Sequence, residues 1–217
     1  MWTEVRNSDG IETGESAAEL SLSPAVGERF ARLYGADERP ETVGDWAASM
    51  REAIERERGR PPAVEDLCTD EAGDHAFVGD DGVQTYVCVL DPLVYPFLTG
   101  ETGTVRSTTP VRGTEVAFEV GADGVAVSHG GAVVSIGVSE DVDAMADTPL
   151  ETVYREVCEY VQTFEDRAEY EAWAESVPAV TMGVPAETGL GIVRELADVL
   201  FEVEVGDVET GPGCDCC

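Results

Sequence analysis

The sequence predicts an α+β fold, with a helical N-terminal subdomain followed by a strand-rich, largely antiparallel core flanked by helices. Apolar residues recur at helical spacing in the N-terminal quarter and again in the last third, whereas the centre holds short β-rich runs separated by glycines. Hydrophobic residues make up 43% of the 217 residues, enough to bury a sizeable core. The expected segments are a flexible acidic arm over residues 1–20, the helical subdomain over 21–67, the core over 68–205 and a flexible cysteine-rich tail over 206–217.

Capping residues mark the ends of two predicted helices in the N-terminal subdomain. Ser23 and Pro24 supply an N-cap and a first-turn proline, and Gly35 follows the last residue of the apolar face. Thr42 begins a second helix with a capping-box pattern, and Gly59 ends that helix. The apolar faces indicate that both helices pack against the main domain.

A hairpin signal opens the central region. Asp80-Asp81-Gly82 lies between two β-rich runs, which is typical of a tight turn between antiparallel strands. Further glycine-bounded runs predict more strands, and helical spacing returns after them. The expected strands are 75–79, 83–90, 102–109, 114–120, 125–128 and 132–138, and the expected helices are 93–98, one that begins at Thr148-Pro149, 166–176 and 187–201.

Acidic residues dominate the charge of the chain. Arginine supplies all 13 basic residues against 45 acidic ones, and the formal net charge is −32. This balance excludes nucleic-acid binding through phosphate neutralisation and disfavours anionic membranes. Because the acids are spread along the whole chain, we interpret them as a halophilic adaptation, since molar salt screens self-repulsion beyond about 3 Å. No segment has the pattern of a leader or a membrane span, so we expect a cytoplasmic protein with reduced cysteines.

Cys88 and Asp91 are the first candidates for chemistry. Cys88 lies near the end of a predicted strand, just before a helix that Asp91 caps and Pro92 begins. A helix N-terminus lowers the pKa of a thiol, although the charge of Asp91 opposes this effect. The alternative is a buried core cysteine beside a capping aspartate. Cys158 lies in a stretch that is ambiguous between helix and strand, and it too could be a core thiol.

Several motifs follow one another along the core. They are Cys88-Val-Leu-Asp91 with Leu93, Pro96 and Leu98-Thr-Gly100; Thr104-Val-Arg-Ser107; Gly113 to Val120; Cys158 with Val161 and Phe164; Trp173-Ala174; and Gly189-Leu-Gly191. In this order they resemble the organomercurial (alkylmercury) lyase family over more than half of the chain, from Thr85 to about Phe201. The chain departs from the family pattern at Val87, Thr109 and Glu159.

The resemblance implies a lyase that cleaves carbon–mercury bonds by protonolysis in mercury detoxification, giving a hydrocarbon and Hg(II). It implies that Cys88 attacks mercury while its proton passes to Asp91, that Cys158 adds a second thiolate, and that Asp91 returns the proton to carbon. No cofactor is required, but small cellular thiols must remove Hg(II), and a mercuric reductase is a candidate acceptor. The N-terminal helices would form a winged-helix-like cap.

Other cysteines and the two histidines are weaker candidates. Cys214, Cys216 and Cys217 follow a flexible Gly-Pro-Gly lead and could form a relay that carries Hg(II), or a tail that binds metal incidentally. His75 and His129 each stand alone beside a predicted turn, and we expect surface or loop histidines.

Two further functions remain open at this point. One is a non-enzymatic protein of the same fold that binds or senses Hg(II) or Cu(I) through thiolates. The other is a thiol redox protein, which the absence of a Cys-x-x-Cys motif before a helix disfavours. Asp91 discriminates between these functions, because a lyase needs its carboxyl group and a metal-binding protein does not.

Overall fold

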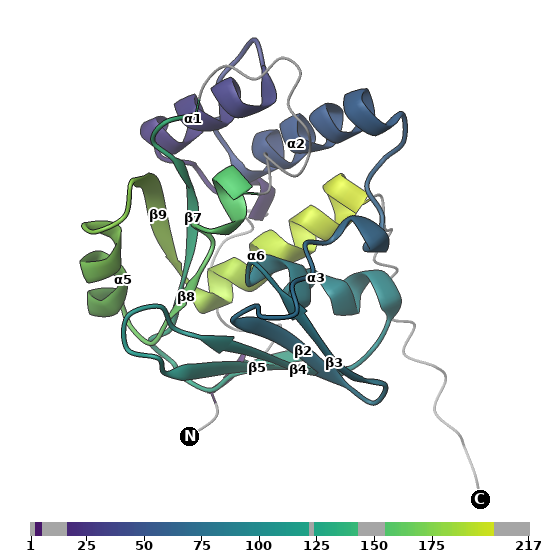
Figure 1. Cartoon of the computed structure of the whole chain (residues 1–217), viewed down its shortest axis with the longest axis vertical. Helices are drawn as coiled ribbons and strands as arrows, with labels where there is room; N and C mark the ends of the chain where they lie inside the picture. Colours follow the sequence, from purple (N-terminus) through teal and green to yellow (C-terminus); the bar gives the residue numbers. More distant parts are fainter. Residues whose placement is uncertain (1–2, 6–16, 122–123, 143–154, 202–217) are drawn as a thin grey trace, which may run out of the picture.

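Two antiparallel sheets organise the part of the chain that the computed structural model describes, residues 3–5, 17–121, 124–142 and 155–201 (Figure 1). Within these residues, one sheet has six strands in the order β1-β6-β5-β4-β2-β3, and the other has three in the order β8-β7-β9. The strands are β1 (Thr3–Val5), β2 (His75–Gly79), β3 (Gly82–Tyr86), β4 (Gly103–Thr108), β5 (Glu115–Gly121), β6 (Gly124–Val127), β7 (Val133–Ser139), β8 (Thr163–Phe164) and β9 (Ala179–Pro185). The predicted α+β class with an antiparallel core is confirmed.

Helices fill the space around and between the sheets. They are η1 (Ala17–Glu19), α1 (Pro24–Tyr34), α2 (Val43–Arg58), η2 (Val64–Asp66), α3 (Leu90–Thr99), α5 (Arg167–Ala174), α6 (Ala186–Glu195) and the π-helical turn η3 (Leu196–Leu200). A further helical turn covers residues 155–158. The predicted start of a helix at Thr148-Pro149 lies outside the described residues.

The N-terminal helices begin and end where their capping residues predict. The Ser23 hydroxyl accepts a hydrogen bond from the Val26 amide, and Gly35 ends α1 in the left-handed conformation at φ 64°. Thr42 and Asp45 form a capping box at the start of α2. The aromatic rings of Phe30 and Trp46 stack at 5.0 Å, which fixes α1 against α2.

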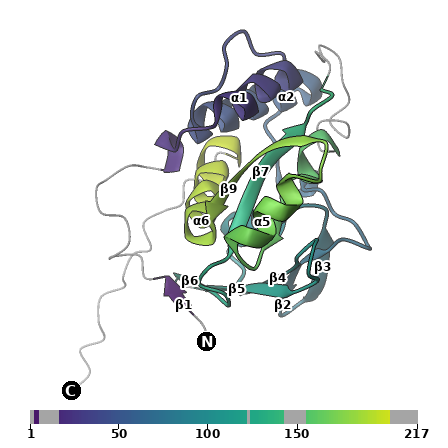
Figure 2. The ribbon, with the colours of Figure 1, turned by 90° about the vertical axis from the view of Figure 1, so that its left-hand side faces the viewer.

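Helix α3 lies between the six-stranded sheet and helix α6. The three-stranded sheet has α5 against one face and α6 against the other (Figure 2). Helix α3 packs against β2, β3 and β4 on one side and against α6 on the other, while α2 packs on α6 and η3. One hydrophobic cluster includes buried residues from α1, α2 and both sheets. The loop that leads into α3 therefore lies where the two sheets and the N-terminal helices converge.

Some elements differ from those that the sequence predicts. Thr3–Val5, expected in a flexible arm, pairs with β6 as an edge strand. β9 was not expected, because Gly183 and Pro185 interrupt its β pattern. The strand predicted over 83–90 ends at Tyr86, and α3 begins at Leu90, so that Asp91 lies inside the first turn instead of capping the helix.

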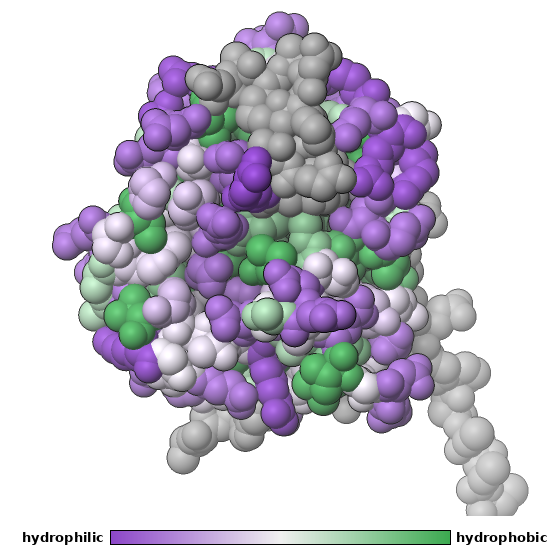
Figure 3. Space-filling model, viewed as in Figure 1, coloured by the Kyte–Doolittle hydropathy of each residue, from purple (hydrophilic) through white to green (hydrophobic). Residues whose placement is uncertain are grey.

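Hydrophilic side chains are widespread on the surface. Hydrophilic side chains cover most of the face seen in Figure 3, with smaller apolar patches between them. Among the helices of the described residues, none combines the length and the apolar character needed to cross a lipid bilayer.

His75 is buried and connects the six-stranded sheet to the segment after Cys158 through hydrogen bonds. The prediction of a surface or loop histidine is wrong. Its side chain is 0% exposed. Nδ1 lies 2.7 Å from the Ser107 hydroxyl, and Nε2 lies 3.1 Å from the amide oxygen of Gln162. Burial lowers the pKa of His75 to about 4, so the ring is neutral at pH 7.

We expect acid to destabilise the protein through His75. Below its ordinary pKa of 6.5 the unfolded chain binds a proton that the folded protein does not bind until about pH 4. The stability that this neutral histidine contributes is present above pH 6.5 and is lost as the pH falls toward 4. Between pH 7 and pH 5 the free energy of unfolding should therefore fall by about 2 kcal/mol from this source.

Urea unfolding of wild type and His75→Gln at the two pH values checks this expectation. The variant should lack this part of the pH dependence, and His129→Gln, which replaces a partly exposed histidine, should keep it. An equal pH dependence in wild type and His75→Gln would contradict it.

Candidate active site

Three backbone segments meet beside the first turn of α3. The central segment runs from Val87 to Val89 between β3 and α3. On one side the Val87 amide donates to the Cys68 carbonyl at 3.0 Å, and on the other the Val89 amide donates to the Val161 carbonyl at 3.3 Å. Val161 in turn donates to the Cys158 carbonyl at 3.2 Å. These bonds bring together cysteines that are far apart in the sequence.

Cys88 and Cys158 form a buried pair of thiols. Their residues are 4% and 7% exposed, respectively, and their side chains are hydrogen-bonded to each other. Asp91 follows Cys88 by three residues and is hydrogen-bonded to its thiol. The structure therefore places Cys88 beside both Cys158 and Asp91, and Cys158 Sγ within 4.8 Å of an Asp91 carboxylate oxygen.

The Asp91 carboxyl group is held in a densely packed position. Oδ2 accepts a hydrogen bond of 2.9 Å from the backbone amide of Cys68. Part of the residue remains accessible, but the carboxyl group is surrounded by protein atoms, and this burial raises its pKa to about 6. Hydrogen bonds from the Cys68 amide and the Cys88 thiol lower the pKa by less than burial raises it. A carboxyl group with this pKa can both accept and donate a proton near neutrality.

The thiols hold their protons more strongly than free cysteine does. The hydrogen bond with Cys158 lowers the pKa of Cys88, but burial and the nearby Asp91 charge outweigh it and raise this pKa. The pKa of Cys158 is raised further, because it donates to Cys68 and Cys88 and is itself buried. The sequence indicated opposing effects of the helix N-terminus and of Asp91 on the Cys88 pKa, and in the structure the backbone amide of Asp91 lowers this pKa by less than burial and the Asp91 charge raise it.

Cys68 is a third thiol of the site, and no sequence motif predicted it. Its Sγ lies 3.9 Å from Cys158 Sγ. The sulfurs of Cys68 and Cys158 and a carboxylate oxygen of Asp91 all lie within 4.8 Å of one another. No motif surrounds Cys68 in the chain, and only the tertiary contact of its loop with α3 reveals it.

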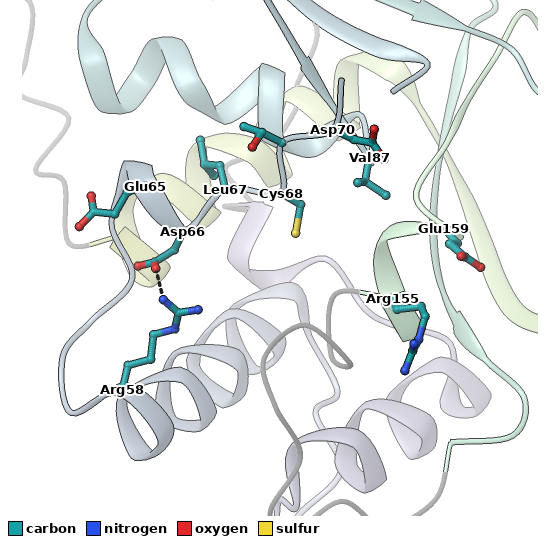
Figure 4. A pocket seen from close by; sticks show the side chains of 10 residues that line it. Arg58, Glu65, Asp66, Leu67, Cys68, Asp70, Val87, Arg155 and Glu159 are labelled. Carbon is teal, nitrogen blue, oxygen red and sulfur yellow. Dashed lines mark hydrogen bonds and ion pairs between the residues drawn. The ribbon is translucent and has the colours of Figure 1, made fainter. Parts of the chain in front are cut away.

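An open pocket of about 490 Å³ lies beside this cluster (Figure 4). Of the three thiols in the described residues, Cys68 lines the pocket, and its sulfur points into it. Arg58, Asp70 and Arg155 also line it, as does Glu159, one of the departures from the family pattern. Cys68 is thus the thiol that faces this pocket, and its Sγ lies 3.9 Å from that of Cys158.

The structure does not test the predicted role of the C-terminal cysteines. Cys214, Cys216 and Cys217 lie outside the described residues, so their role as a relay stays a prediction. Thr109 is buried, and its hydroxyl accepts from the Thr114 amide at 3.1 Å in the turn between β4 and β5. It thus has a local structural partner.

A buried thiol pair beside a carboxyl group that can carry a proton defines a protein that binds a soft metal through sulfur and transfers protons next to it. The family profile described as alkylmercury lyase matches residues 69–198, a range that contains Cys88, Asp91 and Cys158. The alkylmercury lyase of Streptomyces lividans is 31% identical over 193 residues, covering 88% of this chain and 81% of that protein. The crystal structure of the mercury-bound form of MerB2 covers 82% of this chain and 100% of that chain, with 11% identity and a TM-score of 0.44.

On the family profile and the Streptomyces relative, this chain belongs to the alkylmercury lyase family. It is therefore an enzyme that cleaves carbon–mercury bonds. The resemblance stated from the sequence is confirmed.

Iodoacetamide should modify Cys68 before the other two thiols of the site. Cys68 is partly exposed in the pocket, whereas Cys88 and Cys158 are buried and hydrogen-bonded. Peptide mass spectrometry at successive times, under native conditions, measures the order of alkylation. Urea-unfolded protein is the control, in which the three rates should become similar. Native labelling of Cys88 or Cys158 before Cys68 would contradict the arrangement.

Proposed function

We propose that this enzyme cleaves organomercurials with Cys88 and Cys158 as sulfur ligands and Asp91 as general acid. The observation that supports these roles is the contact of two buried thiols with one carboxyl group whose pKa is raised to about 6. Mercury(II) prefers thiolate sulfur, and cleavage of its bond to carbon requires a proton at that carbon. The site supplies both, with Asp91 hydrogen-bonded to Cys88 and within 4.8 Å of Cys158 Sγ.

The first step is a ligand exchange on mercury. An organomercurial carried by a small thiol, R–Hg–SR′, reacts with the Cys88 thiol. A bond forms between Cys88 Sγ and mercury, the bond to R′S breaks, and the Cys88 proton passes through Asp91 to the departing thiolate. Asp91 suits this transfer, because it is hydrogen-bonded to Cys88 and is ionised at pH 7.

The second step breaks the carbon–mercury bond. Cys158 Sγ bonds to mercury while its proton passes to Asp91 and from there to the carbon, which leaves as R–H. In the overall reaction, R–Hg–SR′ and the two protein thiols are consumed. The products are R–H, R′SH and Hg(II) bound to Cys88 and Cys158. Each thiol replaces its proton by mercury, so the buried pair gains no net charge during the reaction.

The setting of the reaction follows from the sequence. We propose a cytoplasmic enzyme that works in high salt, on the basis of its net charge of −32 and its thiols. Cellular thiols then remove Hg(II), and a mercuric reductase is a candidate acceptor. The proposed chemistry needs no resident cofactor, because sulfur and carboxyl groups supply every step.

Hydrocarbon release tests the catalytic roles. Purified protein with methylmercury or phenylmercury, in molar salt with excess small thiol, should release methane or benzene. Asp91→Asn, Cys88→Ser and Cys158→Ser should each lower the rate by about 100-fold or more, because each removes the acid or a sulfur ligand. Gas chromatography of the headspace measures the product.

Asp70→Asn is the matched control for this experiment. Asp70 lines the same pocket, and the Ala72 amide donates to its Oδ1, an interaction that asparagine preserves. This variant should keep the wild-type rate. No hydrocarbon from the wild type, together with Hg(II) binding that persists in Asp91→Asn, would instead indicate a thiolate protein that binds or senses mercury.

A further inference from the structure

We propose that Cys68 is a third sulfur ligand for Hg(II) and the thiol through which the ion leaves the buried pair for the pocket. The origin of the ion from an organomercurial rests on the proposed function, whereas the binding of Hg(II) by three sulfurs can be tested without it. The motif that indicates the family includes Cys88 and Cys158 only, and the family profile begins at residue 69, after Cys68.

The spacing of the Cys68 and Cys158 sulfurs suits a shared soft ion. Cys68 Sγ and Cys158 Sγ are 3.9 Å apart. Thiolates that share one tetrahedral zinc ion, at about 2.3 Å each, are about 3.8 Å apart. Mercury needs a slightly wider spacing, which small rotations of the side chains provide. Cys158 is also hydrogen-bonded to Cys88, so it is the common neighbour of the other two sulfurs.

The three sulfurs differ in their accessibility to solvent, and we infer a different role for each from this difference. Cys88 and Cys158 are buried and do not line the pocket, so we expect a small thiol in the pocket to reach an ion on Cys68 more readily than one between the buried pair. The Cys68 sulfur points into the pocket (Figure 4) and lies 3.9 Å from Cys158 Sγ. An ion that adds Cys68 as a ligand is therefore placed where an external thiol can reach it.

The loop that carries Cys68 is fixed by its backbone. The Cys68 amide donates to Asp91 at 2.9 Å, and its carbonyl accepts from Val87 at 3.0 Å. The main chain is thus held on both sides, and only the side chain has to turn toward the ion. Substitution of the sulfur leaves both backbone bonds in place.

Protons and charge balance in the transfer. After the hydrocarbon has left, Asp91 is a carboxylate next to the Cys68 thiol. The S–H bond of Cys68 breaks, its proton goes to Asp91, and its sulfur bonds to Hg(II), which then carries three thiolates and one negative charge. Two external thiols take the ion away. Their two protons and that of Asp91 restore the three protein thiols, and Asp91 is again ionised.

X-ray absorption at the mercury edge counts the sulfurs. One equivalent of mercuric chloride is added to full-length protein in which Cys214, Cys216 and Cys217 are replaced by serine, so that they cannot compete for the ion. We expect three sulfurs around mercury, and two in Cys68→Ser and in Cys68→Ala. Cys88→Ser, which also leaves two thiols, calibrates the count. Two sulfurs around mercury in the protein that retains Cys68 would overturn the proposal, whether or not the variants fold.

The rate of mercury removal tests the path to the pocket. With excess glutathione as the external thiol, loss of Hg(II) from Cys68→Ser should be about tenfold slower than from the same protein with Cys68. Thr69→Ala, a change at the neighbouring exposed residue of the pocket, is the control and should not alter the rate. Removal that is equally fast or faster without Cys68 would overturn the path. Both experiments start from Hg(II), so their outcome is independent of hydrocarbon release, which tests the proposed function.

Discussion

The hydrogen bond from the Cys68 amide to the Asp91 carboxyl group is the interaction on which the site depends. A carboxyl group that is buried on folding needs hydrogen-bond donors. Burying it without donors costs several kcal/mol of folding free energy. Asp91 has this amide at 2.9 Å and the Cys88 thiol. The same bond joins the loop after η2 to the first turn of α3. The hydrogen bond that stabilises the Asp91 carboxyl group therefore also holds the loop that places Cys68 Sγ 3.9 Å from Cys158 Sγ.

The buried site combines two thiols with raised pKa values, Cys88 and Cys158, and one carboxyl group, Asp91, that titrates near neutrality. Burial raises the pKa values of Cys88 and Asp91, and hydrogen bonds to the other two thiols contribute most to the raised pKa of Cys158. A strongly acidic protein could not collect several thiolates in its interior without uncompensated charge. Mercury resolves this, because a divalent ion replaces two protons and leaves the buried charge unchanged. The raised pKa values thus favour the thiol forms of Cys88 and Cys158 before the metal binds.

Local signals in the sequence predict much of the fold. Ser23, Thr42 and Gly59 bound their helices as expected, since caps depend on residues three or four positions apart. The hairpin at Asp80-Asp81 is confirmed for the same reason. β9 was missed because Gly183 breaks its pattern, yet a side chain there would collide with the Tyr170 ring. That glycine is a requirement of packing, which local rules do not reveal.

The site was predictable in part, for a similar reason. Cys88 and Asp91 belong to one short motif, and the resemblance adds Cys158 from a distant segment. Cys68 has no motif, and Asp91 was expected to cap α3, because the competing donor, an amide 23 residues earlier, cannot be seen in sequence. His75 was assigned to the surface because its partners, Ser107 and Gln162, are 32 and 87 positions away.

The position of Cys158 is determined by both sheets together. From the three-stranded sheet, Ser135 donates to the Tyr160 carbonyl at 2.8 Å, and Gly137 lets the chain approach so closely that a Cβ there would lie 2.7 Å from Tyr160 Cβ. From the six-stranded sheet, His75 holds Gln162. The segment is thus fixed immediately after Cys158 on two sides. Because side chains that bind a metal must keep their spacing within fractions of an ångström, this double support lets a thiol at the end of a short helical turn serve as a precise ligand.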